Sequence, residues 1–249
     1  MLRLAATAIA LAAATLAVGC SSPDDVVEAR RSEVSRELAT LAKIGADANA
    51  APAARPGGAL RAPSAPVVVC SMRGGALVRD CNAIVVYAET LAEPAKFREH
   101  TKNPGREHVA FGHDAAVAEP AQILERGVVV REEADPAKGP AAYREAPVTL
   151  SAKGVEVHFD DLAAVRWVFV VRPDAAREAG DARSFGAGVY MYNARTGEAH
   201  GAMRVDAACA DEATAPAKAG ARSRCLDGAG RAAFEAELVR QIPTARVQR

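Results

Sequence analysis

Aromatic side chains are scarce in this chain: they make up 4% of its 249 residues, and there is a single tryptophan. A core with so few rings has to be packed mainly from aliphatic side chains. A net charge is also missing, because 31 basic side chains balance 31 acidic ones. Since binding to a phosphate backbone needs an excess of Lys and Arg, the composition predicts no nucleic-acid partner.

Recognisable catalytic motifs are lacking as well. The sequence contains no G-x-S-x-G, Walker A or EF-hand pattern. Gly228-Ala229-Gly230-Arg231-Ala232-Ala233 fits a dinucleotide-binding fingerprint, but no predicted strand precedes it, so we interpret it as a loop and the start of a helix. We therefore predict no catalytic residue, no cofactor and no metal site.

Long apolar runs are confined to the N-terminus, where Leu4 to Val18 follows the single charge of Arg3. This pattern is typical of a secretory signal peptide, and its length is marginal for a membrane-spanning helix. The run ends in Leu16-Ala17-Val18-Gly19-Cys20, which resembles the lipobox of bacterial lipoproteins, although the family usually has Leu, Val or Ile in place of Ala17. The alternative is an ordinary secretory signal in which the cysteine occurs by chance.

The resemblance covers residues 1–22 only, and it implies what happens to that segment. Residues 1–19 would be removed, and Cys20 would be acylated and would anchor a soluble domain to a membrane. In Gram-negative lipoproteins a residue other than aspartate after the cysteine is compatible with sorting to the outer membrane, and here that residue is Ser21. The expected location is the cell envelope, on the periplasmic side of the outer membrane.

Four cysteines follow Cys20, and an even number in an exported protein predicts two disulfides. We favour the local pairs Cys70–Cys81 and Cys209–Cys225 among the three possible connectivities. The first pair brackets a glycine-rich turn, and the second closes a polar loop. A zinc site is the rival interpretation, but the chain has no C-x2-C pair to support it.

Three parts are predicted after the signal peptide. Residues 20–46 should form an N-terminal tether helix, because Ser22-Pro23-Asp24-Asp25 combines an N-cap, a proline at the first position and acids in the first turn. Residues 47–66, rich in Ala, Pro and Gly, should be a linker that lets the domain stand off the membrane. Residues 67–249 should be the globular domain.

The helix also has apolar residues near heptad spacing, at Val27, Val34, Leu38 and Leu41. A coiled coil needs more heptads than this helix offers, so packing on its own domain is the simpler interpretation. Oligomeric scaffolding through this helix remains an alternative.

We predict an α+β fold for the domain: a small, mostly antiparallel sheet covered by a C-terminal helix. Residues 165–172 are apolar on both alternating faces, which favours a central strand. Phe234, Leu238 and Ile242 recur every four residues and predict the covering helix. Further strands are expected at residues 66–70, 83–88 (with a helix to residue 91 as the alternative), 127–130, 155–160, 188–192 and 199–205.

The last two of these strands allow a register to be predicted. If Arg195-Thr196-Gly197 is a three-residue loop with Gly197 left-handed, Ala194 pairs with Glu198. Val189 then lies opposite Met203, Met191 opposite Gly201, Tyr190 opposite Ala202 and Tyr192 opposite His200.

This register predicts one candidate ligand face, formed by Tyr190, Tyr192, His200 and Arg204. The competing interpretation is that the closing helix covers the tyrosine rings and leaves their polar ends in water. A second candidate site is the polar loop with His100, His108, His113 and Asp114, whose histidines could converge on a metal or could simply be solvated.

The sequence therefore predicts a membrane-anchored exported lipoprotein, non-enzymatic, that serves in binding or envelope assembly. Its partner at the membrane is the lipid layer, reached through Cys20. The alternatives are an exported metal-dependent hydrolase that uses the loop from His100 to His113, or the helical scaffold.

Overall fold

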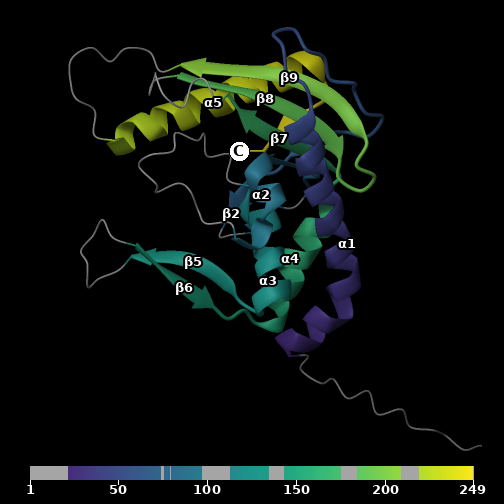
Figure 1. Cartoon of the computed structure of the whole chain (residues 1–249), viewed down its shortest axis with the longest axis vertical. Coiled ribbons are helices and arrows are strands. Elements are labelled where there is room, and N and C mark those ends of the chain that lie inside the picture. Colours follow the sequence, from purple (N-terminus) through teal and green to yellow (C-terminus); the bar gives the residue numbers. More distant parts are fainter. Residues whose placement is uncertain are drawn as a thin grey trace, which may run out of the picture.

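A computed structural model describes residues 22–73, 76–78, 80–96, 113–134, 143–174, 184–208 and 219–248. Within them the protein has a mixed α/β fold built on a six-stranded sheet (Figure 1). Two buried apolar clusters lie on opposite faces of this sheet. The predicted signal peptide and Cys20 lie outside the described residues.

The sheet is mixed, with the strand order β10-β1-β4-β7-β8-β9. From β10 through β1 and β4 to β7 neighbouring strands are parallel, whereas β7, β8 and β9 are antiparallel. The strands are β1 (Val68–Val69), β4 (Ala83–Tyr87), β7 (Trp167–Pro173), β8 (Ser184–Asn193), β9 (Ala199–Ala208) and β10 (Arg246–Val247). The expected mostly antiparallel sheet is thus wrong for three of its five neighbouring strand pairs. Helices between β4 and β7 carry the chain back to the same end of the sheet, which makes that pair parallel.

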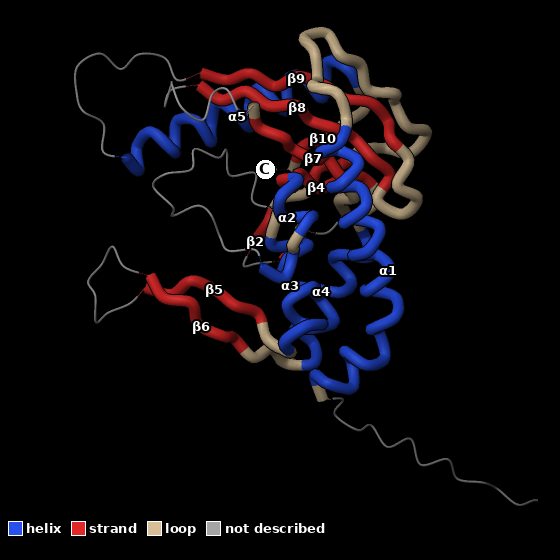
Figure 2. Tube along the Cα trace, viewed as in Figure 1, coloured by secondary structure: helices blue, strands red, loops and turns tan. Residues whose placement is uncertain are grey.

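The helices are distributed unequally over the two faces of the sheet (Figure 2). Four of them contribute to one cluster or lie beside it, and the C-terminal helix covers the other face, as predicted. They are α1 (Pro23–Ala50), α2 (Ala88–Ala92), α3 (Ala115–Arg126), α4 (Ala152–Ala164) and α5 (Ala219–Gln241), with a 3-10 turn at Pro94–Lys96. Two small hairpins complete the described fold: β2 (Met72–Arg73) with β3 (Ala76–Leu77), and β5 (Val129–Ala134) with β6 (Tyr143–Val148).

Strand β7 is central, and it is buried on both faces as its sequence predicts. Trp167, Phe169 and Val171 pack into one cluster, which also holds Phe234 and Leu238 of α5. Val168 and Val170 pack into the other cluster. Strict alternation over residues 165–172 would put Val165 on the face of Trp167, but Val165 lies in the second cluster, because it is the C-cap of α4 and precedes the strand.

Helix α1 starts where the sequence predicts and runs further than expected. Ser22 and Asp25 form a capping box, with Pro23 at the first helical position. The helix continues past Gly45 to Ala50. Its buried side chains belong to the cluster that contains Val168 and Val170 of β7. They are Val26, Val27, Val34, Leu41, Ile44 and Ala48. Helix α1 is therefore packed into the domain.

Residues 51–66 lie against the edge of the sheet and do not form a free spacer. Leu60 forms a bridge to Gly201 of β9, and the backbone N–H of Arg61 donates to the carbonyl of His200. Gln241 of α5 bonds the backbone of both Gly58 and Leu60. A Cβ at Gly201 would come within 2.3 Å of the Ala59 carbonyl oxygen, so the absence of a side chain there permits the contact. The small residues that suggested a linker instead allow close packing.

Residues 155–160, expected as a strand, lie inside α4. Val155, His158, Phe159 and Leu162 are buried at helical spacing, whereas Val157 is exposed. Ser151 caps the helix by accepting a hydrogen bond from the Gly154 N–H at 3.2 Å. The apparent period of two was a coincidence of three apolar residues.

Helix α5 is longer than the sequence suggested, and α3 directly follows the polar loop that was expected to contain His113 and Asp114. Helix α3 begins at Ala115, and Gly127 ends it at a φ of 68°. Helix α5 begins at Ala219, so the segment Gly228–Ala233 lies inside a helix and not at its start. The expected polar loop before Cys225 is helical from Ala219 onward. Cys209 and the side chain of Cys225 lie outside the described residues, and so does the pairing expected between them.

The β8–β9 hairpin has the predicted register along most of its length. Val189 lies opposite Met203, Tyr190 opposite Ala202 and Met191 opposite Gly201, and Gly197 has a φ of 72°. The register then shifts, so that Tyr192 lies opposite Ala199 and not opposite His200. The Asn193 N–H bonds the Glu198 carbonyl, and the Ala194 N–H bonds Arg166 of the neighbouring chain segment, so Ala194 does not pair with Glu198. His200 is the extra residue of a bulge, and a bulge turns a side chain to the other face.

Candidate functional site

The tyrosines of the candidate ligand face are covered, and α1 with the segment after it provides the cover. The Tyr190 hydroxyl donates to the Pro52 carbonyl at 2.8 Å, and the Arg172 guanidinium lies 4.8 Å from the centre of its ring. Arg172 also donates to the carbonyls of Ala48 and Ala51 at the end of α1. Tyr192 is buried in the same cluster. The expectation that the closing helix covers these rings was wrong, because α5 lies on the opposite face.

The other two members of that candidate face are engaged elsewhere. The bulge places His200 edge-to-face against Trp167, with ring centroids 4.9 Å apart, and its Nδ1 lies 3.1 Å from the Arg61 carbonyl oxygen. Arg204 donates to Asp174 and Asp206, and these hydrogen bonds raise the pKa of its guanidinium. The four side chains therefore do not form one ligand face.

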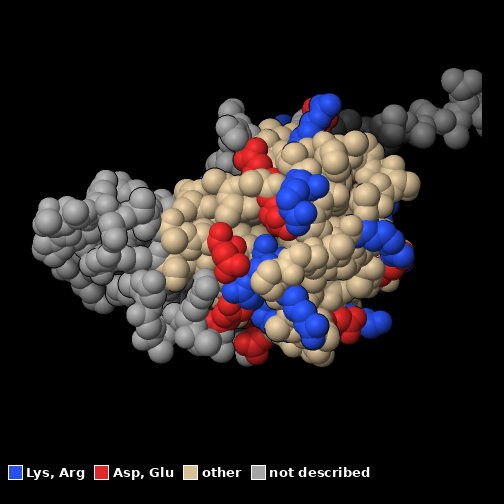
Figure 3. Space-filling model, turned by 90° about the horizontal axis from the view of Figure 1, so that it is seen from above, with Lys and Arg blue, Asp and Glu red and all other residues tan. Residues whose placement is uncertain are grey.

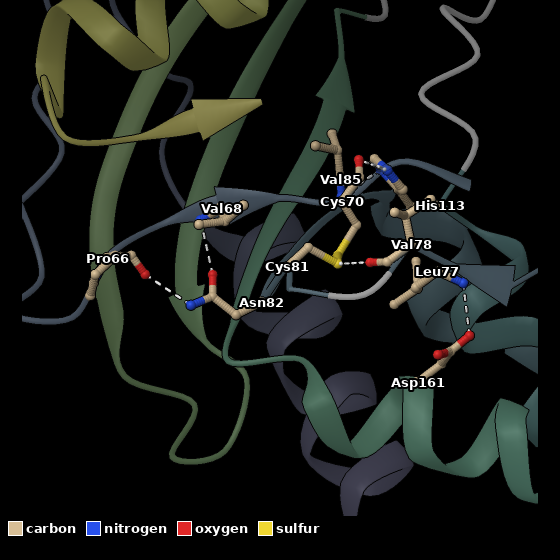
Figure 4. The surroundings of a disulfide bond; sticks show 10 residues. All are labelled: Pro66, Val68, Cys70, Leu77, Val78, Cys81, Asn82, Val85, His113 and Asp161. Atoms are coloured by element: carbon tan, nitrogen blue, oxygen red, sulfur yellow. Dashed lines mark hydrogen bonds between the residues drawn. A yellow bond between two sulfur atoms is a disulfide. The ribbon is translucent and has the colours of Figure 1, made fainter. Parts of the chain in front are cut away.

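The disulfide Cys70–Cys81 is present, as predicted (Figure 4). It joins the residue after β1 to a residue shortly before β4 and closes the β2–β3 hairpin into a loop. Asn82 reinforces this join, since its side chain accepts from the Val68 N–H and donates to the Pro66 carbonyl, both at 2.9 Å. The start of β4 is thus held to β1 by one covalent bond and by side-chain hydrogen bonds.

His113 is a buried residue that bridges β1 and β4 beyond the disulfide (Figure 4). Its Nδ1 accepts from the Val85 N–H at 3.1 Å, so the proton is on Nε2, which donates to the Cys70 carbonyl at 2.8 Å. Burial lowers the pKa of His113 to about 4. The imidazole is neutral at physiological pH, and both of its nitrogens are used.

Asp114 makes a similar contact two residues further along β4. Its Oδ1 accepts from the Tyr87 N–H at 3.0 Å and from the Thr90 hydroxyl at 2.6 Å. Burial raises the pKa of Asp114 to about 6, even though both hydrogen bonds favour its ionised form. The carboxyl group is therefore held in a site that disfavours its charge.

The reason for both contacts is the short length of β1. In β4 the backbone groups of residues 83, 85 and 87 point toward β1, and Cys70, the residue directly after β1, makes the last backbone bond there by donating to the Ala83 carbonyl. Beyond that point the N–H groups of Val85 and Tyr87 would be buried without partners, which costs about 1–3 kcal/mol for each group. His113 and Asp114 supply the missing acceptors. This pair substitutes for a strand.

The carboxyl ends of parallel strands are the usual ligand site of open α/β sheets. Here His113 and Asp114 lie at that edge, and their side chains already form hydrogen bonds with the protein. A metal at His113 would have to break a hydrogen bond to Val85 or Cys70, so the side chain is not available as a ligand in this arrangement. His100 and His108 lie outside the described residues. Among the described side chains no group of three or more metal-binding residues converges.

A second buried polar pair joins α3 and α4. His158 Nδ1 lies 3.2 Å from Glu119 Oε2, and both side chains are largely buried. The sequence did not predict this pair, because residues 155–160 were expected to form a strand with His158 on its solvent-exposed face. The signal that would have found it is the helical spacing of His158 with Val155 and Leu162.

No helix in the described part of the chain is long and apolar enough to cross a membrane. Comparisons with protein-family models, curated proteins and solved structures gave no match. The residues of this chain are therefore the whole basis for what is proposed below.

Proposed function

We propose that this chain is an exported lipoprotein, anchored through an acylated Cys20 on the periplasmic side of the outer membrane. Its mature domain would be a non-enzymatic module for binding or envelope assembly. The observation that carries this proposal is the motif Leu16–Cys20 at the end of an apolar run that begins after one positive charge.

The disulfide supports export. Cys70 is buried and bonded to Cys81, and such bonds persist in oxidising compartments such as the periplasm. The position of Ser22 also supports cleavage before Cys20, because the capping box starts the folded domain two residues later. A mature chain that begins at Cys20 loses nothing from the described fold.

The two alternatives have less support. A coiled-coil scaffold needs a free apolar stripe on α1, but Val27, Val34 and Leu41 are buried against the same chain. A metal-dependent hydrolase would need His113, whose two ring nitrogens bond backbone groups. Zinc analysis of the purified protein tests the second alternative: stoichiometric zinc that is lost in a His108→Ala variant would favour the enzyme.

The anchor is tested by replacing its cysteine. A Cys20→Ser variant, expressed with the signal peptide, should remain an unprocessed precursor and should take up no fatty-acid analogue. A Ser22→Ala variant is the matched control, because it changes a neighbouring residue without removing the thiol, and it should be labelled like the parent. Unchanged labelling of Cys20→Ser would refute the anchor.

The binding role is tested in the native envelope. Crosslinking of the mature protein in intact cells should give discrete adducts with an envelope component, and these should disappear in the Cys20→Ser variant because the protein is then mislocalised. If the correctly anchored protein gives no adduct and a purified sample turns over an ester, amide or phosphoester substrate, the non-enzymatic assignment is wrong.

A further inference from the structure

We infer that α1 fixes the orientation of the domain on the membrane: it holds the end of the molecule formed by Ser22, the end of α3 and the start of α4 against the lipid surface. This inference rests on the proposed acylation of Cys20. It replaces the free linker that the sequence suggested at residues 47–66 with a rigid attachment through α1.

The first observation is the length of chain between anchor and fold. Ser21 alone separates Cys20 from the N-cap Ser22. Two residue steps span at most about 7 Å, so an acylated cysteine cannot move far from the end of α1. Ser22 itself is fixed: its backbone N–H donates to Asp25 at 2.9 Å, and its hydroxyl accepts from the Asp25 N–H at 3.2 Å.

The second observation is that the first turns of α1 are bound to the body of the domain. Val26 and Val27 are buried in the same cluster as α3 and α4. Arg30 forms an ion pair with Asp160 of α4 at 2.8 Å, and Arg31 donates to the Leu124 carbonyl of α3. The helix therefore cannot swing about Cys20 independently of the domain.

The third observation is where α1 ends. Its 28 residues span about 42 Å at 1.5 Å per residue, and it runs from the α3–α4 end of the molecule to the sheet (Figure 1). At its far end Arg172 of β7 donates to three backbone carbonyls, at distances of 2.7 to 2.9 Å. Both ends of α1 are thus joined to the domain, and the anchor sits at one of them.

The far end of the molecule, which this geometry presents to the periplasm, carries charges of both signs (Figure 3). Arg204 of β9 pairs with Asp174, which follows β7, and Arg61 pairs with Glu198, which precedes β9. A surface of mixed charge gives no attraction to anionic lipid, whereas the position of Cys20 ties the opposite end to the membrane.

Quenching by lipid tests this orientation. The acylated protein is purified in detergent, placed in phosphatidylcholine vesicles that contain a nitroxide-headgroup lipid, and labelled with a thiol fluorophore at Glu28→Cys or Asp47→Cys. Both residues are exposed on α1, and they lie 19 residues apart, about 28 Å along the helix. The probe at position 28 should be quenched several-fold more than the probe at position 47. Equal quenching, or the reverse order, would overturn the inference.

A second pair of labelling sites, Ser32→Cys and Asn49→Cys, is the control for a variant that misfolds. The probe at position 32 should again be quenched more than the probe at position 49. The parent chain carried through the labelling gives the background. Insertion of Gly-Ser repeats between Ser21 and Ser22 should reduce the difference between the two positions, and an unchanged difference would show that chain length does not set the orientation.

Mass spectrometry of the N-terminal peptide in the same samples separates the two proposals. If Cys20 carries no acyl group, the proposed anchor fails and this inference fails with it. If Cys20 is acylated and the two probes are quenched equally, the anchor stands and only the fixed orientation is wrong.

Discussion

Phe169 shows at the scale of one residue how the core is held. Its side chain is fully buried in the cluster between β7 and α5, and its ring meets the ring of Phe234 edge-to-face, with centroids 5.4 Å apart. In a chain with few aromatic residues this contact joins the central strand to the closing helix. The consequence is that a large part of the packing on this face depends on one ring.

Truncation of that ring should cost about 3–5 kcal/mol. We therefore expect Phe169→Ala to lower the melting temperature strongly or to unfold the domain, as measured by thermal and urea unfolding. Val239→Ala on the same helix α5 is the control, because this residue is 41% exposed and its loss should change the stability by less than about 0.5 kcal/mol. An unchanged melting temperature for Phe169→Ala would mean that β7 is not central.

His113 and Asp114 have opposite effects on stability as pH changes. His113 has a pKa of about 4 in the folded state against an ordinary value of 6.5, so the unfolded chain binds its proton more readily. The contribution of His113 to the free energy of unfolding is therefore complete above about pH 6.5, and it is lost as the pH falls toward 4. Asp114 has a pKa of about 6 against an ordinary 3.8, so the folded state binds its proton more readily. The contribution of Asp114 to the free energy of unfolding is therefore complete below about pH 4, and it is lost as the pH rises through 6.

The two slopes should largely cancel between pH 4 and 6, since each contribution is on the order of 3 kcal/mol. Separate variants should reveal them. The stability of His113→Gln, relative to the parent, should fall as the pH rises from 4 to 6, and that of Asp114→Asn should rise over the same range. Urea unfolding at several pH values measures both. Slopes of the same sign in the two variants would contradict the assignment.

The disulfide belongs to the scale of elements, because it fixes a strand and a hairpin. Its two cysteines are 11 residues apart, and closing a loop of that size stabilises the fold by about 2–3 kcal/mol in the chain-entropy model. The double variant Cys70→Ser with Cys81→Ser should lose stability of that order, and non-reduced peptide mapping should link Cys70 to Cys81 in the parent.

Reduction provides the control for that experiment. Dithiothreitol should destabilise the parent by a similar amount, and the double variant should lose nothing more through this bond. Two free thiols at Cys70 and Cys81 in protein isolated from cells under non-reducing conditions would show that the bond does not form in the cell.

Helix α4 shows why some elements were predicted wrongly. Val155, Val157 and Phe159 alternate with polar residues and predict a strand, but Ser151 caps a helix whose buried residues include His158. Val155 and Phe159 are also four residues apart, as on one face of a helix, so these two positions fit both periods, and only the contact with α1 and α3 decides between them. Strand β7 was predicted correctly because a run that is apolar on both faces fits a buried strand.

At the scale of the whole molecule, α1 is the element whose role changed most. It was expected to be a tether ahead of the domain, and it supplies buried residues from its first turn to its last. Sequence alone cannot say which surface an amphipathic helix covers, because an apolar stripe packs equally well on another chain or on its own. Here it packs on α2, α3 and α4 of its own domain.

This role gives a clear expectation for one substitution. Val34 is fully buried in the middle of α1, so Val34→Asp places a charge in the core and should cost more than about 3 kcal/mol. Ser35→Asp, at the next and exposed position, should change the stability by less than about 0.5 kcal/mol. Thermal unfolding compares the two. If Val34→Asp leaves the domain as stable as Ser35→Asp does, α1 is a detachable tether after all.

The sequence by itself determined the local features of this protein. It gave correctly the start of α1, the central strand, the left-handed Gly197, most of the β8–β9 register and the covering helix, because each depends on residues close together in the chain. The Cys70–Cys81 pair follows from the same closeness. The motif Leu16–Cys20, which resembles a lipobox, is also local, and its role is a proposal.

Only the tertiary structure decided the features that depend on distant residues. Whether β4 and β7 run parallel depends on the helices between them, and the packing of residues 51–66 depends on a bare backbone at Gly201. The candidate ligand face was lost for a similar reason: one extra residue in β9 turned His200 away from Tyr192, and the segment after α1 covered Tyr190. His113 and Asp114 became structural because β1 is too short to bond all of β4, and no pattern in the sequence records where a neighbouring strand will end.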